Sequence, residues 1–162
     1  MLVDAHHHLW NLSEVNYPWL MEKGATRFFG DPTPIQRNYL LDEHISNLEP
    51  FKFNASVHVQ VGAEDGWQEA KWIDQIATNS KNWKIVQVAF CDLAAPDFLD
   101  KINKLSKFKS LRGVRQIIGR AEKEDAQTGT NNLLNDPKFL DGLKYISKLG
   151  LTFDLQLTPN LY

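Results

Sequence analysis

Two histidines near the amino terminus have the residue type and spacing of a metal-binding pair. The chain reads Val-Asp-Ala-His-His-His-Leu-Trp over residues 3–10, so one residue separates His6 from His8. Side chains at positions i and i+2 of a β-strand point to the same side, and a strand over 2–8 therefore brings these two imidazoles together. Neutral imidazole is a common ligand of zinc and related ions, so the pair predicts half of a transition-metal site. The simpler explanations are a purification-tag remnant and histidines with a purely structural role.

A third metal ligand has two candidates in the sequence. A catalytic zinc ion normally has three protein ligands and one open position. Asp4 lies on the same predicted strand face as His6, and His58 belongs to the next predicted strand. The alternative for Asp4 is a supporting role, in which its carboxylate fixes the orientation of an imidazole.

Strands and helices alternate along the chain after a long first connection. Hydrophobic alternation and continuous apolar runs predict strands at 2–8, 54–62, 84–91, 111–118 and 151–157. Helical periodicity, with an N-cap near Asn38 for the first helix and at Asp136 for the last, predicts helices at 40–49, 64–79, 97–108 and 136–149. Gly150 is expected to end the last helix, and residues 119–136 are expected to form a polar loop.

The first connection, residues 9–38, combines Pro and Gly with many aromatic side chains, including Trp19. Long loops in compact domains are usually functional or disordered, and the aromatic content argues against disorder. We expect this loop to form a lid or pocket wall at the end of the first strand. Packing on the outside of the fold is the alternative.

Polar side chains on two predicted strands need a physical explanation. Ser56, His58 and Gln60 alternate with valines, so one face of that strand is either solvated or lines a polar centre. Arg115 lies in an otherwise apolar strand, where a guanidinium needs an anionic or hydrogen-bonding partner. That partner is either a substrate group or a nearby carboxylate.

Composition describes an ordinary globular domain. The chain has 162 residues, of which 43% are hydrophobic and 23% charged, and we expect one domain over 1–162. The net charge of −2 gives no indication of a nucleic-acid or anionic-membrane surface. No apolar run approaches the roughly 18 residues of a membrane span, and no secretory signal begins the chain, so we expect a cytoplasmic protein. The single Cys91 excludes an internal disulfide and a cysteine-based zinc site.

The order of elements predicts an α/β fold of the (β/α)8 or TIM-barrel type. Alternating strands and helices form parallel sheets with right-handed crossovers. No glycine-rich phosphate loop follows the first strand, which argues against a dinucleotide-binding sheet. Barrel enzymes gather their chemistry at the carboxyl ends of the strands, where the first strand has its histidines. A whole barrel needs about 250 residues, so we expect a partial barrel with five strands and four helices.

The ordered motifs resemble the amidohydrolase superfamily. Within it, the chain is similar to the amidohydrolase-related branch of metal-dependent TIM-barrel hydrolases that includes sugar lactonases such as L-fuconolactonase. The matching residues span the chain at 3–10, 17–19, 57–60, 92–93, 113–115 and 153–155. Their order and spacing fit the first five strands of that family.

The resemblance implies a hydrolase that acts on a lactone or a similar cyclic ester. It implies that His6 and His8 bind one divalent metal ion, with zinc the first choice, and that Gln60, Arg115 and Trp19 face the substrate. That substrate is expected to be a small lactone or a carboxylate-bearing ring. Some similar proteins work without a metal, so a metal-independent hydrolase or decarboxylase is the alternative within the superfamily.

The family's strand-6 histidine and strand-8 aspartate have no counterpart up to Tyr162. The expected general base, an aspartate, would therefore lie beyond the given residues. A half-barrel leaves two open sheet edges and an uncovered inner face. Three arrangements follow: a piece of a longer hydrolase, a homodimer that covers the open barrel, or a non-catalytic binding module.

Overall fold

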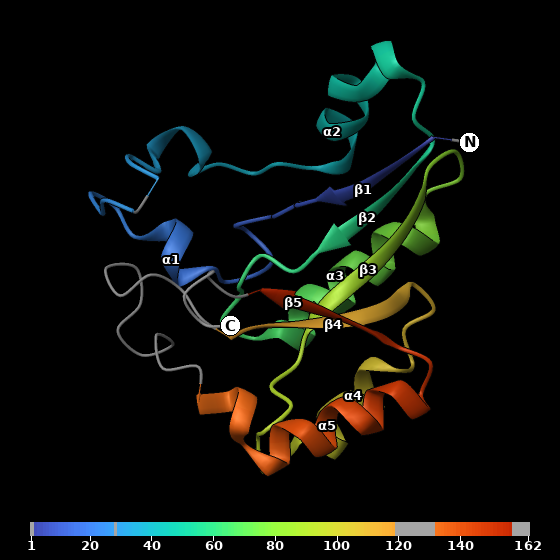
Figure 1. Cartoon of the computed structure of the whole chain (residues 1–162). Helices are drawn as coiled ribbons and strands as arrows, with labels where there is room; N and C mark the ends of the chain where they lie inside the picture. Colours follow the sequence, from blue (N-terminus) through green and yellow to red (C-terminus); the bar gives the residue numbers. More distant parts are fainter. Residues whose placement is uncertain (1, 28, 119–131, 157–162) are drawn as a thin grey trace.

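A single parallel sheet of five strands forms the centre of the protein. The computed structural model describes residues 2–27, 29–118 and 132–156. The strands are β1 (Val3–His7), β2 (Ala55–Val59), β3 (Lys84–Phe90), β4 (Leu111–Ile117) and β5 (Thr152–Gln156), and they lie side by side in chain order (Figure 1). Every neighbouring pair is parallel, so each connection crosses over through the helical layer. The predicted partial barrel is confirmed.

Four helices connect the strands as predicted, and one extra turn of helix lies in the first loop. The helices are α1 (Pro18–Met21), α2 (Leu41–Leu48), α3 (Gly66–Asn79), α4 (Phe98–Leu105) and α5 (Pro137–Lys148). Short 3-10 turns occur at Thr33–Ile35, Glu49–Phe51 and Asn132–Asn135. In Figure 1 the long first loop, with α1, extends from the arrowhead end of β1. The predicted loop at 119–136 falls mostly outside the described residues.

The ends of the last helix follow directly from local chemistry. The Asp136 side chain accepts a hydrogen bond from the Lys138 amide at 2.8 Å, and Pro137 occupies the first helical turn. Gly150 follows the helix with φ of +71°, a left-handed conformation that glycine adopts without strain. Both predicted helix signals are confirmed.

The predicted cap of the first long helix is wrong. Leu40, without a side-chain cap, precedes α2, while the Asn38 side chain accepts a hydrogen bond from the Leu12 amide at 2.8 Å. A short polar side chain near a helix start can bond a distant backbone instead of the helix itself. Here that bond ties the long loop back to its own beginning.

Two apolar clusters lie between the sheet and the helices. The first joins β3 and β4 to α4 and α5, and its most buried members include Val114, Ile102, Leu93, Phe139 and Ile146. The second joins the long loop to α3 and β3, through Leu9, Val15, Tyr17, Leu20, Trp72, Ile73, Trp83 and Ile85. The loop therefore packs as part of the core along its first half, so these aromatic and aliphatic residues stabilise the fold.

A glycine in α5 allows that helix to approach the chain after β3. A methyl group added at Gly142 would lie 2.7 Å from the carbonyl oxygen of Leu93 and 2.8 Å from its Cβ. Because backbone atoms cannot move aside cheaply, we expect Gly142→Ala to lower the free energy of unfolding by about 1–3 kcal/mol. Urea titration followed by circular dichroism measures this change. Lys144→Ala, on the same helix, is the control and should change stability by less than about 0.5 kcal/mol; equal effects would contradict close packing at Gly142.

Contacts with the helices establish which way the strand side chains point. Gln87 of β3 donates to the Ala70 carbonyl of α3, and His58 of β2 contacts Glu69 of α3. Successive strand residues point to opposite sides, so the neighbours of Gln87 and His58 face the concave inner side of the sheet. Within the described ranges, every helix is too short or too polar to cross a membrane.

Candidate active site

His6 and His8 meet at the carboxyl end of β1. Their Nε2 atoms are 3.3 Å apart, and the two rings stand nearly perpendicular at 83°. Two nitrogens of a tetrahedral zinc site, at Zn–N distances of about 2.0–2.1 Å, are separated by about 3.3 Å. The sequence-predicted juxtaposition is therefore present, with both nitrogens at the spacing that one ion requires. That His6 and His8 bind a metal ion remains a prediction.

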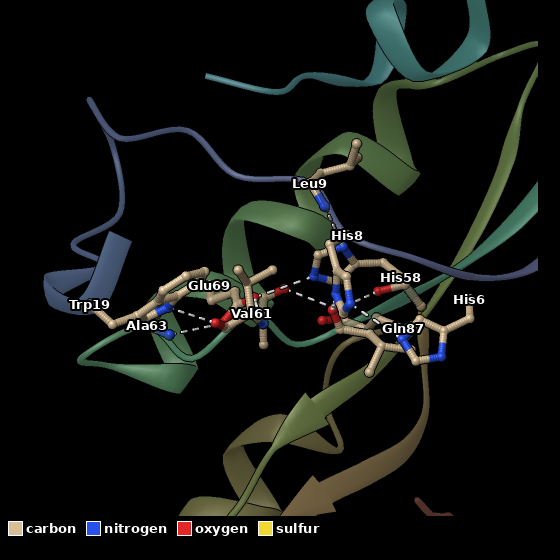
Figure 2. A network of polar contacts seen from close by, with 12 residues as sticks. His6, His8, Leu9, Trp19, His58, Val61, Ala63, Glu69 and Gln87 are labelled. Atoms are coloured by element: carbon tan, nitrogen blue, oxygen red, sulfur yellow. Dashed lines mark hydrogen bonds and ion pairs between the residues drawn. The ribbon is translucent and has the colours of Figure 1, made fainter. Parts of the chain in front are cut away.

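The ring of His8 is held by the neighbouring strand (Figure 2). Its Nδ1 lies 2.7 Å from the carbonyl oxygen of Val59. A carbonyl only accepts hydrogen bonds, so Nδ1 carries the proton and Nε2 keeps a lone pair toward His6. Burial is the main cause that lowers the pKa of His8, with the Val59 hydrogen bond acting in the opposite direction. A neutral imidazole with a free Nε2 is the form that binds a metal.

Asp4 does not share the face of His6. The register of β1 against β2 shifts between Asp4 and His7, and this irregularity breaks the simple alternation of side chains. As a result the Asp4 carboxylate lies 3.5 Å from Nε2 of His44 on α2. The sequence expectation that Asp4 lies on the His6 face is wrong, because a one-residue slip reverses the side to which a strand residue points.

His58 is buried on the helix side of β2. Its Nδ1 accepts a hydrogen bond from the Leu9 amide at 3.2 Å, and its Nε2 lies 3.4 Å from Oε1 of Glu69. Ser56, on the same side of β2, accepts from the indole of Trp83 at 2.8 Å. The polar face of β2 is thus not solvated. It lines a polar centre between the sheet and the helices, away from the His6 and His8 pair.

A second group of histidines surrounds that centre. His7 stacks on His44 with ring centroids 4.2 Å apart and meets His58 edge-on at 5.7 Å. Both ring nitrogens of His7 are buried without a hydrogen-bond partner in the described part of the chain. Desolvation is the largest cause that lowers the pKa of His7 to about 2, and the other imidazoles reinforce it. His7 is therefore neutral at any physiological pH.

Glu69 is a buried acidic residue of this polar centre that the sequence analysis did not single out. Glu69 precedes Trp72 and Ile73 of the predicted helix over 64–79 by three and four residues and so lies on its apolar stripe. Its side chain is 2% exposed. An acidic residue on the buried stripe of a helix was the available signal, because a buried carboxylate needs several hydrogen-bond donors.

Arg115 of β4 faces the inner side of the sheet. It donates to the side-chain oxygen of Gln156 on β5, and its charge contributes to lowering the pKa of His8. Asp154 is the register partner of Arg115. Phe153 packs on Phe139 of α5, so alternation directs Asp154 toward the same inner face as Arg115. The inner face thus carries a positive group close to the histidine pair.

Gln60 and Trp19 occupy more enclosed places. Gln60 is 5% exposed, and its Oε1 is buried without a partner among the described residues. The indole of Trp19 donates to the Val61 carbonyl at 2.9 Å, which anchors the long loop beside the end of β2 (Figure 2). Their predicted contacts with substrate remain predictions.

Among residues 2–27, 29–118 and 132–156, no group of three or more His, Cys, Asp or Glu side chains is arranged to hold a metal ion. The donor set at the carboxyl end of β1 consists of two imidazoles. It fits two positions of a tetrahedral ion.

A separate pocket of about 440 Å³ lies between the start of α3, the end of β3 and the second half of α4, lined in part by Trp67, Asp92, Lys101 and Cys91. Cys91 is a buried free thiol whose pKa is raised to about 12, chiefly by burial. A thiol with so high a pKa is a poor nucleophile at neutral pH. Cys91 therefore acts as a core residue.

Comparison with known proteins finds an uncharacterized relative and solved structures that share the fold. No family model matches the chain. An uncharacterized protein of Sinorhizobium fredii, y4mH, is 29% identical over 160 residues, which are 96% of this chain and 53% of that protein. The chain thus spans about half the length of the curated relative that it matches.

Two solved structures share the fold. An amidohydrolase from Burkholderia multivorans with bound HEPES has a TM-score of 0.69 and 20% identity, over 96% of this chain and 48% of its own. A probable 2-pyrone-4,6-dicarboxylic acid hydrolase from Acinetobacter baumannii with bound citric acid has a TM-score of 0.63 and 17% identity, over 98% and 50%. The match covers the amino-terminal half of both structures. The predicted likeness to the amidohydrolase type of barrel is confirmed at the level of the fold.

Proposed function

We propose that this chain provides the amino-terminal half of a hydrolase site for a lactone or another carboxylate-bearing cyclic ester. The observation that carries the proposal is the His6 and His8 pair, whose Nε2 atoms lie 3.3 Å apart at the carboxyl end of β1. The carboxyl ends of barrel strands are where such enzymes carry out their chemistry. The similarity in fold to two hydrolase structures supports the reaction class.

His6 and His8 would hold one divalent ion, with zinc as the first choice. Such an ion, when bound, polarises a substrate carbonyl or lowers the pKa of a bound water to about 7. The proton on Nδ1 of His8 keeps its Nε2 available, and the lowered pKa of His8, caused mainly by burial, favours the neutral ring. Arg115 would bind a substrate carboxylate or the developing oxyanion through charge-assisted hydrogen bonds. Gln60 and Trp19 would complete the pocket wall.

Zinc titration of the purified chain tests the metal site. We expect binding of one ion, and at least about a tenfold weaker affinity, or about 1.4 kcal/mol, in His6→Ala and in His8→Ala because each removes a ligand. Isothermal titration calorimetry measures both the stoichiometry and the affinity. Asp42→Asn is the control, since Asp42 belongs to α2 and not to the pair, and it should bind zinc like the unchanged chain. Equal zinc affinity in all four proteins would contradict the site.

Hydrolysis tests the reaction class. A panel of sugar lactones and pyrone carboxylates is assayed with the 162-residue chain and, if the coding sequence continues, also with the longer chain. We expect turnover that a chelator abolishes and that His6→Ala and His8→Ala lose. Turnover that survives both the chelator and these substitutions would favour a metal-independent hydrolase.

Citrate is a suitable probe for Arg115, because citric acid occupies the related solved structure. We expect Arg115→Met to weaken citrate binding about tenfold, by loss of a charge-assisted contact, while zinc affinity changes little. Competition calorimetry in the presence of zinc measures both values. A fall in zinc affinity alone would contradict a role for Arg115 toward the substrate.

A further inference from the structure

We infer that Glu69, acting through His58, is a positioning residue for His8. This inference rests on the proposed function, because it gives Glu69 a task at the proposed metal ligand. The hydrogen-bonding contacts of Glu69 are with His58, Val61 and Ala63, and not with His6 or His8. Its effect passes through the hydrogen bonds that Figure 2 shows between β1, β2 and α3.

The Glu69 carboxylate binds three donors. Its Oε1 accepts from the Val61 amide at 2.6 Å and lies 3.4 Å from Nε2 of His58. Its Oε2 accepts from the Ala63 amide at 3.4 Å. Both oxygens are therefore engaged, and the turn that follows β2 closes around this one buried side chain. A carboxylate supplies acceptors only, which is what three converging N–H groups require.

The Glu69 contact selects the tautomer of His58. His58 accepts the Leu9 amide at Nδ1, so the ring proton must lie on Nε2, which faces the Glu69 oxygen. If the proton moved to Nδ1, the Leu9 amide would lose its acceptor. Leu9 directly follows His8, so this bond fixes the backbone at the end of β1.

His8 is thus held at two points that both depend on this network. Its backbone is fixed by the Leu9 amide on His58, and its ring is fixed by the Val59 carbonyl at 2.7 Å. Val59 lies between His58 and the Val61 amide that Glu69 binds, so the same carboxylate holds β2 on both sides of it. Loss of the network would let the His8 ring turn away from His6. Outer partners of this kind typically change metal affinity about 10- to 100-fold.

Three substitutions separate positioning from simple stability. Glu69→Gln keeps the size of the side chain but turns one acceptor into a donor, so one buried N–H loses its partner. His58→Phe removes the acceptor for Leu9. His58→Asn keeps an oxygen that can accept from the Leu9 amide, and it serves as the matched rescue variant.

The readouts are zinc affinity by calorimetry and the His8 Nδ1–H signal in ¹⁵N-edited NMR of the metal-free chain. A merely structural role would lower the unfolding midpoint without changing either readout in the folded protein. We expect Glu69→Gln and His58→Phe, checked for folding by circular dichroism, to lose the protected Nδ1–H signal and to bind zinc about tenfold or more weakly. His58→Asn should retain both properties.

The inference fails if folded Glu69→Gln keeps the His8 signal and the zinc affinity, or if His58→Asn and His58→Phe behave alike. If the unchanged chain binds no zinc, the proposed function fails. The NMR signal then still decides whether Glu69 orients His8, so the two failures are distinguishable.

Discussion

Replacing His7 with leucine is expected to flatten the acid side of the pH–stability profile. His7 is 6% exposed, and burial, with the nearby His58 and His44, lowers its pKa from 6.5 to about 2. The unfolded chain takes up a proton at this position below pH 6.5, whereas the folded protein does not. The contribution of His7 to folding stability is therefore fully present above pH 6.5 and is lost as the pH falls toward 2. The loss between pH 7 and pH 5 is about 2 kcal/mol.

His7→Leu removes this proton linkage and also removes two buried ring nitrogens that lack partners. At pH 8 we expect the variant to be at least as stable as the unchanged chain, because unpaired buried polar groups cost about 1–3 kcal/mol. Urea unfolding at pH 8, 6 and 5, followed by circular dichroism, gives the free energy at each pH. The slope that remains should reflect His44 and His8, whose pKa values burial also lowers.

His7→Gln is the matched control. Glutamine does not titrate, so the stability of His7→Gln should depend on pH as little as that of His7→Leu. Glutamine keeps a buried polar group, so His7→Gln should be less stable than His7→Leu at every pH. If the free energy of unfolding changed with pH equally in all three proteins, His7 would not be the cause of the loss of stability in acid.

Phe139→Ala should destabilise the protein by about 3–5 kcal/mol, the range for a fully buried aromatic ring. Phe139 of α5 is 1% exposed and meets Phe153 of β5 edge-on, with ring centroids 5.7 Å apart. This contact fixes the edge strand β5 against its helix. Since Arg115 is bonded to Gln156 on the same strand, loosening β5 also loosens that inner-face contact.

Thermal and urea unfolding measure the effect of Phe139→Ala. Phe51→Ala is the control, because that ring is 61% exposed and its removal should change stability by less than about 0.5 kcal/mol. A loss of similar size in both variants would contradict a core role for Phe139.

The architecture could be predicted from the sequence, because the information that specifies strands and helices is local. Apolar runs and helical periodicity give the order of strands and helices, and a parallel sheet follows from their alternation. The ends of α5 depend only on Asp136 and Gly150, whose side chain and backbone freedom act within a few residues. The spacing of His6 and His8 was also sufficient to bring their rings together, since strand geometry alone directs residues i and i+2 to one side.

The contact partners of the polar side chains depend on long-range packing. Asp4 turned to His44 because the register of β1 slips against β2, and a slip depends on the pairing of two strands far apart in the sequence rather than on either strand alone. Glu69 reached His58 because α3 packs on β3, next to β2, and no periodicity encodes that meeting. Long-range packing determines what a residue touches and, where the strand register slips as at Asp4, also the side to which it points. Two imidazoles that meet on one strand could therefore be predicted, and the buried carboxylate that we infer orients one of them could not.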